Sequence, residues 1–229
     1  MTLHQIRGGT SKALKQKEYN IAIGISLGNK WFTPENIFDL TLWSLDNTKD
    51  FVVVYVADLI HAINIEVRDG VSIVKAEKKA KKMGKKMMED VKQILSEKIE
   101  PEVAKKIYLA TWADFINEDY LAKMDYLYNL YGNDQEFQEV ILNIVEDFVS
   151  KEERTFTVED KRRFGTYIIE EMPEMLTKLP VGDLVYDANA YPFDSLIAKL
   201  CEDIQTGKAF PQIKADIIDQ GNRVFLEVR

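Results

Sequence analysis

A serine flanked by two glycines is the residue of this sequence best suited to covalent chemistry: Ser26 lies between Gly24 and Gly28. It follows an apolar run of β-forming residues at 19–25, which predicts a buried strand with an exposed end. In an open α/β sheet, ligands bind at the carboxyl ends of the strands. Because neither glycine carries a side chain, the Ser26 hydroxyl could approach a substrate closely. Ser26 is therefore the candidate nucleophile.

The segment Gly24-Ile25-Ser26-Leu27-Gly28 also matches the nucleophile elbow of α/β-hydrolases. A hydrolase of that class needs a histidine late in the chain, after its acid. The only histidines are His4 and His61, so a serine-histidine-acid hydrolase is nearly excluded. The simpler alternative is a glycine-serine turn that closes a strand and has no chemical role.

A second candidate pair is Tyr167 and Glu171, which are four residues apart and therefore share one face of a predicted helix. On the helical wheel, Glu170 and Glu174 are predicted to point elsewhere. The neighbours of the pair on its own face are apolar: Phe164, Ile168 and Met175. A carboxylate in apolar surroundings has a raised pKa, which suits a general base. The alternative is a glutamate at the edge of the apolar face that reaches solvent.

Lysines are concentrated in one segment of an acidic protein. The net charge of the chain is −8, yet residues 75–86 hold seven lysines and one glutamate, a local charge of +6. At 100° per residue, six of these lysines fall within an arc of about 120°: Lys75, Lys78, Lys79, Lys82, Lys85 and Lys86. This lysine strip is either an ordinary solvated face or a docking face for a polyanion, and its nearly uniform sign favours the second.

The dipeptide Tyr191-Pro192 lies between a short strand predicted at 184–186 and a helix predicted at 193–205, so 189–192 is predicted to be a loop. We expect it at the same end of the sheet as Ser26. The alternative is an ordinary strand-to-helix turn, in which proline is common.

The pattern along the chain alternates between strands and helices. Further strands are predicted at 51–58, 107–114 and 223–228, and further helices at 34–47, 71–98, 118–150 with a break at 132–133, and 157–179. This alternation predicts one α/β domain over residues 1–229, Rossmann-like, with a mostly parallel sheet flanked by helices. Residues 1–18 form a candidate flexible segment.

Composition narrows the class further. Hydrophobic residues make up 46% and charged residues 30% of the chain, as in soluble globular proteins. The single cysteine, Cys201, excludes a disulfide framework and a cysteine-based zinc cluster. No apolar run approaches the ~20 residues of a membrane helix, and the first 18 residues lack the apolar core of a secretory signal. We therefore expect a cytoplasmic protein.

Together, these motifs resemble one family, the cyclodipeptide synthases, over nearly the whole chain. The resemblance is carried by Gly24-Ile25-Ser26-Leu27-Gly28-Asn29, Tyr167-Ile168-Ile169-Glu170-Glu171-Met172-Pro173 and Ala190-Tyr191-Pro192, with the basic helix between the first two. Tyr191-Pro192 resembles the Tyr-Pro subclass of the family, in which Asn29 is a mixed marker.

The resemblance implies a fold similar to the catalytic domains of class I tyrosyl- and tryptophanyl-tRNA synthetases, without their ATP-binding motifs. It implies two aminoacyl-tRNAs as substrates and a 2,5-diketopiperazine as product. An aminoacyl ester is already activated, so we expect no cofactor and no metal. We also expect a monomer that uses neither DNA nor a membrane.

The resemblance also implies residue roles. Ser26 would form an aminoacyl-enzyme, with the vicinal ribose hydroxyl of the tRNA as its base. Glu171 would take a proton from the amine of the second aminoacyl-tRNA, Tyr167 would orient the amino group, and Tyr191 would relay a proton during cyclisation of the dipeptidyl-enzyme. Substrate-binding roles would fall to Gly24, Asn29, Pro192 and Asp194, and tRNA binding to the lysine strip. The alternative function is a tRNA-binding module that has a synthetase-like fold without the chemistry.

Overall fold

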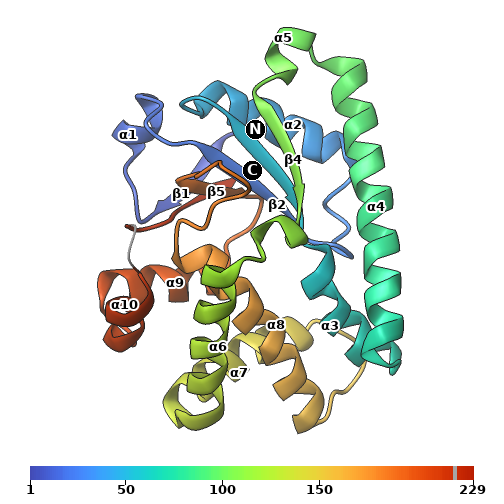
Figure 1. Cartoon of the computed structure of the whole chain (residues 1–229), viewed down its shortest axis with the longest axis vertical. Coiled ribbons are helices and arrows are strands. Elements are labelled where there is room, and N and C mark those ends of the chain that lie inside the picture. Colours follow the sequence, from blue (N-terminus) through green and yellow to red (C-terminus); the bar gives the residue numbers. More distant parts are fainter. Residues whose placement is uncertain (219–220) are drawn as a thin grey trace.

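The sheet forms the centre of the molecule. The structure is a computed structural model, and it describes residues 1–218 and 221–229. Within them the strands are β1 (Leu3–Arg7), β2 (Ile21–Ile25), β3 (Val52–Val56), β4 (Ile107–Thr111), β5 (Ala188–Tyr191) and β6 (Val224–Val228). They pair in the order β1-β6-β5-β2-β3-β4 (Figure 1). Only β1 runs antiparallel to its neighbour, which confirms the predicted mostly parallel sheet.

Helices cover both faces of this sheet (Figure 1). Those described are α1 (Ser11–Lys15), α2 (Pro34–Asn47), α3 (Asp58–Asp69), α4 (Ile73–Lys98), α5 (Pro101–Ala104), α6 (Glu118–Asn133), α7 (Gln135–Val149), α8 (Val158–Leu176), α9 (Leu196–Thr206), α10 (Pro211–Ile217) and the short 3₁₀ helix η1 (Trp112–Phe115). Apolar side chains of α2 and of the second half of α4 pack on one face of the sheet. Helices α3, α6 and α8 lie on the other face.

The two central strands explain the buried position of the sheet. β2 has the sequence IAIGI and β3 the sequence VVVYV, without a charged residue in either. Alternate residues point to opposite faces: Ile23 and Val54 pack toward α2 and α4, whereas Ala22 and Val53 pack toward α3 and η1. Continuous apolar strands of this kind are stable only where helices cover both faces.

The order of the strands creates a crevice at one position. From β2 the chain runs outward to β3 and β4, and the later strands β5 and β6 lie on the opposite side of β2. Between β2 and β5 the order of the strands therefore reverses. In open α/β sheets, ligands bind at such a reversal, outside the carboxyl ends of the strands. Ser26 directly follows β2, and Tyr191 is the last residue of β5.

Most predicted helices are confirmed, including α2 over the predicted residues 34–47 and the break between α6 and α7. The strand predicted at 184–186 was wrong. Leu184 forms only an isolated bridge with Val181, and the strand β5 occupies residues that the sequence predicted as a loop. In β5, Asn189 faces the crevice, whereas Ala188 and Ala190 are buried in the core. Asparagine is typical of turns, so the alternation of the two strand faces was not recognised in the sequence.

Other boundaries also differ from the sequence prediction. The strand predicted at 107–114 ends at Thr111, because Thr111 and Asp114 form a capping box that starts η1. The helix predicted from 193 begins at Leu196, after the N-cap Ser195. No element was predicted for residues 1–18, a candidate flexible segment, but the structure places β1 and α1 there.

A buried arginine joins α8 to the end of the sheet. Arg223, which immediately precedes β6, is 0% exposed and donates hydrogen bonds to the backbone carbonyls of Glu174, Tyr186 and Thr177. Its guanidinium lies 3.9 Å from the centre of the Tyr186 ring. The charge is therefore compensated by several acceptors at once, as a buried cation requires.

We expect Arg223→Met to lower the free energy of unfolding by about 3 kcal/mol, because three buried carbonyl groups lose their donor. Urea unfolding of the variant measures the loss. Arg229→Met is the matched control, since Arg229 is 58% exposed and its loss should change stability by less than about 0.5 kcal/mol. Equal stabilities of the two variants would contradict this account of Arg223.

Candidate active site

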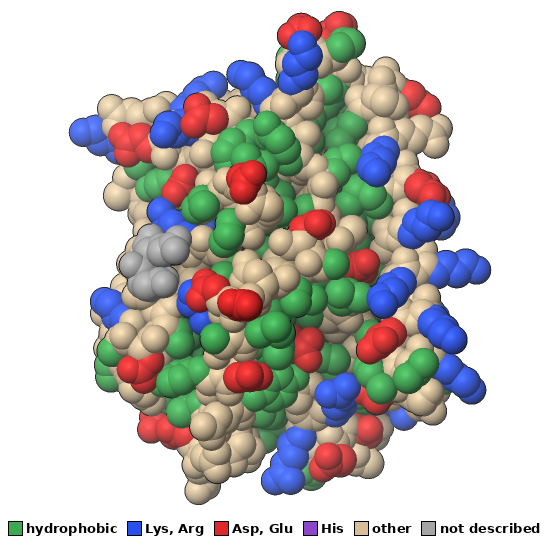
Figure 2. Space-filling model, viewed as in Figure 1, with side chains coloured by type: hydrophobic (Ala, Val, Ile, Leu, Met, Phe, Trp, Pro, Cys, Tyr) green, Lys and Arg blue, Asp and Glu red, His purple; other side chains and the backbone are tan. Residues whose placement is uncertain are grey.

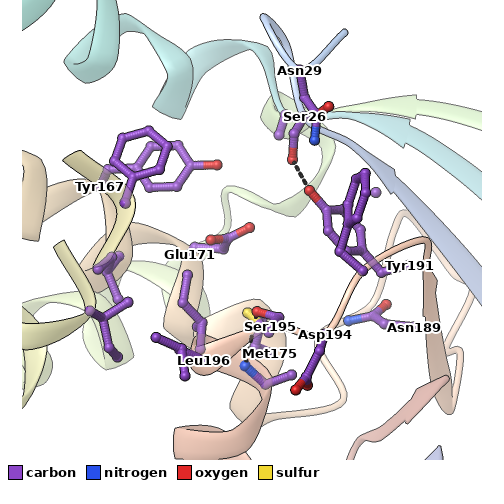
Figure 3. Close-up of a pocket in the computed structure, with 18 of the residues that line it drawn as sticks. Ser26, Asn29, Tyr167, Glu171, Met175, Asn189, Tyr191, Asp194, Ser195 and Leu196 are labelled. Atoms are coloured by element: carbon purple, nitrogen blue, oxygen red, sulfur yellow. Dashed lines mark hydrogen bonds between the residues drawn. The ribbon is translucent and has the colours of Figure 1, made fainter. Parts of the chain in front are cut away.

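A cavity of about 450 Å³ opens at the carboxyl ends of the central strands. Its walls come from β2, β3, β5 and β6 on the sheet side, from α8 and the start of α9 opposite, and from α7 at the mouth. Four residues proposed from the sequence line it together: Ser26, Tyr167, Glu171 and Tyr191 (Figure 3). They come from three separate elements of the chain, so only the fold brings them together.

Ser26 lies at the top of this cavity, one residue beyond β2. Its Oγ is 3.0 Å from the hydroxyl oxygen of Tyr191, and either group can be the donor (Figure 3). The expectation that Tyr191 lies at the same end of the sheet as Ser26 is confirmed. The turn after the serine depends on Gly28, whose φ of +81° is a conformation that favours glycine.

Tyr167 and Glu171 project from α8 into the cavity, with Tyr167 to the left of Ser26 and Glu171 below it in Figure 3. Their spacing of four residues places both on the cavity side of the helix, as the sequence predicted. Within the described part of the chain, no side chain donates a hydrogen bond to the Glu171 carboxylate. Burial, followed by the nearby charge of Glu174, raises the pKa of Glu171 to about 8. The group therefore exchanges its proton close to neutral pH, which suits a general acid or base.

The two phenols of the site remain protonated at neutral pH. Burial, together with the charge of Glu171, raises the pKa of Tyr167 well above its ordinary value. Burial also raises the pKa of Tyr191, against the opposing effect of its hydrogen bond with Ser26. Each hydroxyl can thus donate a hydrogen bond to an amine or oxygen in the cavity and pass a proton along.

The four residues expected to bind substrate have different positions. Gly24, Asn29 and Asp194 line the cavity, whereas Pro192 is buried outside its lining. Asn29 accepts a hydrogen bond from the backbone N–H of Trp31 at 3.0 Å, which fixes the turn after Ser26. Asp194 is exposed at the mouth, where its carboxylate lies 2.7 Å from the guanidinium of Arg7 in β1.

The lysine strip runs along the outer face of α4, at the right edge of the molecule in Figure 2. All six of its lysines are exposed. Three have a carboxylate partner: Lys79 with Asp69, Lys86 with Asp90 and, at 3.9 Å, Lys85 with Glu89. In the part of the chain that the structure describes, the other three lysines, Lys75, Lys78 and Lys82, make no ion pair within 4 Å.

The polar residues of the cavity that were not found from the sequence include Glu174, Tyr55 and Asn189. The prediction that Glu174 points away from the site was wrong, since it is 1% exposed and lines the cavity. Glu174 follows Glu171 by three residues, a spacing that also places two side chains on one helix face. That spacing was the available signal. Glu170 does point elsewhere, toward the hydroxyl of Tyr128 at 2.7 Å.

Neither histidine reaches the nucleophile. His4 is exposed on β1, and His61 packs beneath the turn at Gly28 outside the cavity lining. Burial and the positive charges of Arg68 and Lys79 lower the pKa of His61 to about 4, so it is neutral at pH 7. Within residues 1–218 and 221–229, no three metal-binding side chains gather, and no helix is long and apolar enough to cross a membrane.

A comparison with family models decides the family. The model described as cyclodipeptide synthase matches residues 6–204. The chain belongs to the cyclodipeptide synthase family. The activity class of this family is tRNA-dependent aminoacyl transfer, and it therefore applies to this chain. A comparison with curated protein sequences finds no match.

Solved cyclodipeptide synthases are similar to the chain over most of its length. One from Bacillus thermoamylovorans has a TM-score of 0.74 at 23% identity, covering 94% of this chain and 90% of that one. A Mycobacterium tuberculosis protein, whose structure relates cyclodipeptide synthetases to type I tRNA synthetases, has a TM-score of 0.67 at 25% identity, covering 85% and 83%. A synthase from Candidatus Glomeribacter gigasporarum, solved bound to Phe-tRNAPhe, has a TM-score of 0.56 at 16% identity, covering 92% and 88%. The class I synthetase-like fold expected from the sequence is confirmed.

The raised pKa of Glu171 predicts a dependence of stability on pH. The pKa of Glu171 is about 8 in the folded protein, against an ordinary value of 4.5. Between pH 4.5 and pH 8, the folded protein therefore keeps a proton on Glu171 that the unfolded chain releases. Stability is therefore lost as the pH rises from 4.5 to 8. Glu171→Gln removes this loss. We expect the variant to exceed wild type by at least about 1 kcal/mol at pH 8 and to match it near pH 4.5.

Urea unfolding at the two pH values measures this difference. Glu139→Gln on α7 is the control, because Glu139 is exposed and its substitution should have the same small effect at both pH values. A difference for Glu171→Gln that does not change with pH would contradict the assignment.

Proposed function

We propose that this cyclodipeptide synthase joins two aminoacyl groups, each taken from an aminoacyl-tRNA, into a 2,5-diketopiperazine through an aminoacyl-enzyme on Ser26. The observation that carries the proposal is the convergence of Ser26, Tyr167, Glu171 and Tyr191 on one open cavity in a member of this family. We place the reaction in the cytoplasm and assign it to a monomer. The pair Tyr191-Pro192 supports the Tyr-Pro subclass.

In the first half-reaction, Ser26 Oγ attacks the ester carbonyl of the first aminoacyl-tRNA. The bond between Oγ and the acyl carbon forms, and the bond from that carbon to the ribose oxygen breaks. The Ser26 proton goes to the leaving ribose oxygen, through the vicinal ribose hydroxyl. No imidazole of the described residues faces Ser26, which supports a base borrowed from the substrate. The ester of the aminoacyl-enzyme is comparable in free energy to the aminoacyl-tRNA ester that is consumed, so the acyl group stays activated.

In the second half-reaction, an amide bond forms between the two aminoacyl groups. For the dipeptide to remain on Ser26, the attacking amine must belong to the group already bound to Ser26, and it attacks the ester of the second aminoacyl-tRNA. This requirement refines the role expected from the sequence. The bond from the second acyl carbon to its ribose oxygen breaks, and the leaving tRNA gains the proton that the amine loses. Glu171 takes the amine proton and passes it on, and its pKa of about 8 supports exchange with an amine near neutral pH. Tyr167, one turn away on α8, orients that amine.

Cyclisation releases the product. The free amine of the dipeptide attacks the carbonyl carbon attached to Ser26, and the bond from this carbon to Oγ breaks. The amine loses one proton and Ser26 gains one, so a proton relay completes the balance. Tyr191 suits this relay, because its hydroxyl is 3.0 Å from Ser26 Oγ and burial keeps it protonated.

The lysine strip supplies the tRNA-binding surface of this proposal. Its exposed charges on α4 suit contacts with the phosphate backbone, which depend on charge rather than on base identity. The related synthase from Candidatus Glomeribacter gigasporarum was solved with Phe-tRNAPhe, which supports aminoacyl-tRNA as the substrate class. A binding module without chemistry would not need an open cavity around a serine, so the cavity favours the enzyme over that alternative.

We expect Ser26→Ala to abolish both the acyl-enzyme and the diketopiperazine, because the variant lacks the hydroxyl that carries the acyl group. Purified protein is incubated with charged tRNAs; intact-protein mass spectrometry detects the ester, and small-molecule mass spectrometry detects the product. Ser96→Ala on the exposed face of α4 is the control and should keep full activity. Product formation by Ser26→Ala at the wild-type rate would remove Ser26 from the mechanism.

We expect the triple charge reversal Lys75→Glu, Lys78→Glu and Lys82→Glu to weaken use of charged tRNA and to reduce its salt dependence. The plot of log(kcat/KM) against log[salt] has a negative slope, and the loss of three phosphate contacts should make this slope less steep by about 2. The same reversal at Lys12, Lys15 and Lys214, exposed on α1 and α10 away from α4, controls for net charge. If both triple variants change the slope equally, the strip is an ordinary solvated face.

A further inference from the structure

Two oxygen atoms at the bottom of the cavity have no hydrogen-bond donor in the described structure: Glu174 Oε2 and Asn189 Oδ1. Both residues line the cavity, and their exposed fractions are 1% and 9%. Their remaining atoms are in use, since Glu174 Oε1 accepts from the Tyr186 hydroxyl and, at 3.0 Å, from Asn189 Nδ2. These contacts fix the orientation of the Asn189 amide and leave its oxygen without a hydrogen-bond donor among the described residues. A buried acceptor without a donor is costly, so a ligand that donates would be favoured here.

This polar floor lies well below the nucleophile. Asn189 is paired with Ala22 in the register between β5 and β2, and Ser26 is four residues further along the chain. At about 3.3 Å per residue, the two levels are about 13 Å apart. Figure 3 shows Ser26 and Asn189 at opposite ends of the cavity, with Glu171 between them. A group attached to Ser26 must therefore be long to reach the floor.

Between the two levels, a glycine makes room for the ring of Tyr55 in the wall of the cavity. Gly24 faces the cavity between the levels of Ala22 and Ser26, and a Cβ atom there would lie 2.7 Å from the Tyr55 hydroxyl oxygen. Met175 and Phe225 add apolar lining. The space therefore suits a long side chain with an apolar body whose far end meets two acceptors.

The charge at the floor is already balanced. Glu174 Oε1 lies 4.0 Å from the guanidinium of Arg223, which is itself fully buried. A cationic side chain would add an uncompensated buried charge beside this pair, whereas a neutral donor would not. An aliphatic side chain would leave both acceptors unpaired.

We propose that the aminoacyl group carried by Ser26 has a long side chain that ends in a neutral hydrogen-bond donor, held by Asn189 and Glu174. The donors that meet this description are a phenol hydroxyl, an indole N–H and a carboxamide. Serine and threonine are too short to reach the floor. This inference rests on the proposed function, since it names the substrate class of the first acyl transfer.

The test compares nearly isosteric substrates on the wild-type enzyme. Single-turnover formation of the Ser26 ester is followed by intact-protein mass spectrometry with tyrosyl- against phenylalanyl-tRNA, and with glutaminyl- against methionyl-tRNA. We expect the donor-bearing member of at least one pair to react at least about tenfold faster, because sites built to bond a donor reject the analogue that lacks it. Equal or faster reaction of the apolar member in both pairs overturns the inference, as does fastest reaction of arginyl- or lysyl-tRNA.

A variant tests the residue directly. Asn189→Leu removes the unpaired oxygen at similar volume and should reduce the preference within the pair to less than about threefold, by speeding the apolar member. Asn133→Leu, at the exposed end of α6, is the matched control and should keep the wild-type preference. An unchanged preference in Asn189→Leu overturns the role of Asn189. The wild-type comparison stands whether or not this variant folds.

Two different outcomes distinguish failure of the proposed function from failure of the side-chain inference. If no charged tRNA acylates Ser26 in the wild-type enzyme, the proposed function itself fails. If Ser26 is acylated but without discrimination between the members of either pair, the function stands and only the inference about the side chain fails.

Discussion

The cost of burying carboxylates on α8 is the constraint on which the site depends. Glu170, Glu171 and Glu174 lie within five residues of one helix that packs against α3, α6, α7 and α9. Glu170 accepts a hydrogen bond from Tyr128, and one oxygen of Glu174 accepts from Tyr186 and Asn189, with Arg223 nearby. Glu171 alone lacks a donor among the described side chains, and its pKa is raised to about 8. The same helix thus carries two structural acids and one that can exchange its proton.

The register of the strands places the other residues of the site opposite this helix. β2 places Ala22, Gly24 and Ser26 at successive levels along one face, and β5 runs parallel to it with Asn189 and Tyr191 at matching levels. The crevice at the reversal of strand order leaves space between these levels and α8. The cavity therefore deepens along the strand direction, from Ser26 toward Asn189. In our proposals, acyl transfer takes place at the Ser26 end of the cavity, and the side chain is recognised at the Asn189 end.

The sequence predicted those parts of the molecule whose signals are local. The apolar strands β2 and β3, the capped helix α2 and the long α4 follow from the spacing of their own residues. Ser26, Tyr167, Glu171 and Tyr191 were each visible in a short motif, and their convergence on one cavity is confirmed. Their chemical roles stay predictions.

What the sequence did not predict depends on contacts between distant segments. β1 is a short strand with a polar and charged sequence, and it exists because it pairs with β6 at the far end of the chain. β5 contains a polar Asn189 that is stable in a buried strand only because Glu174, fifteen residues earlier, accepts its amide. Glu174 itself looks like an ordinary surface residue until Arg223 and Tyr186 are placed beside it.

The pairing of β1 with β6 also has a consequence for biosynthesis. Residues 3–7 are synthesised long before their partners at 225–228. Until then, Arg7 cannot be held in the sheet beside Asp194 at the mouth of the cavity. Contacts between residues so far apart in sequence form late, since closing a long loop is entropically expensive. A nascent chain therefore cannot assemble the finished cavity until the residues of β6 have been synthesised.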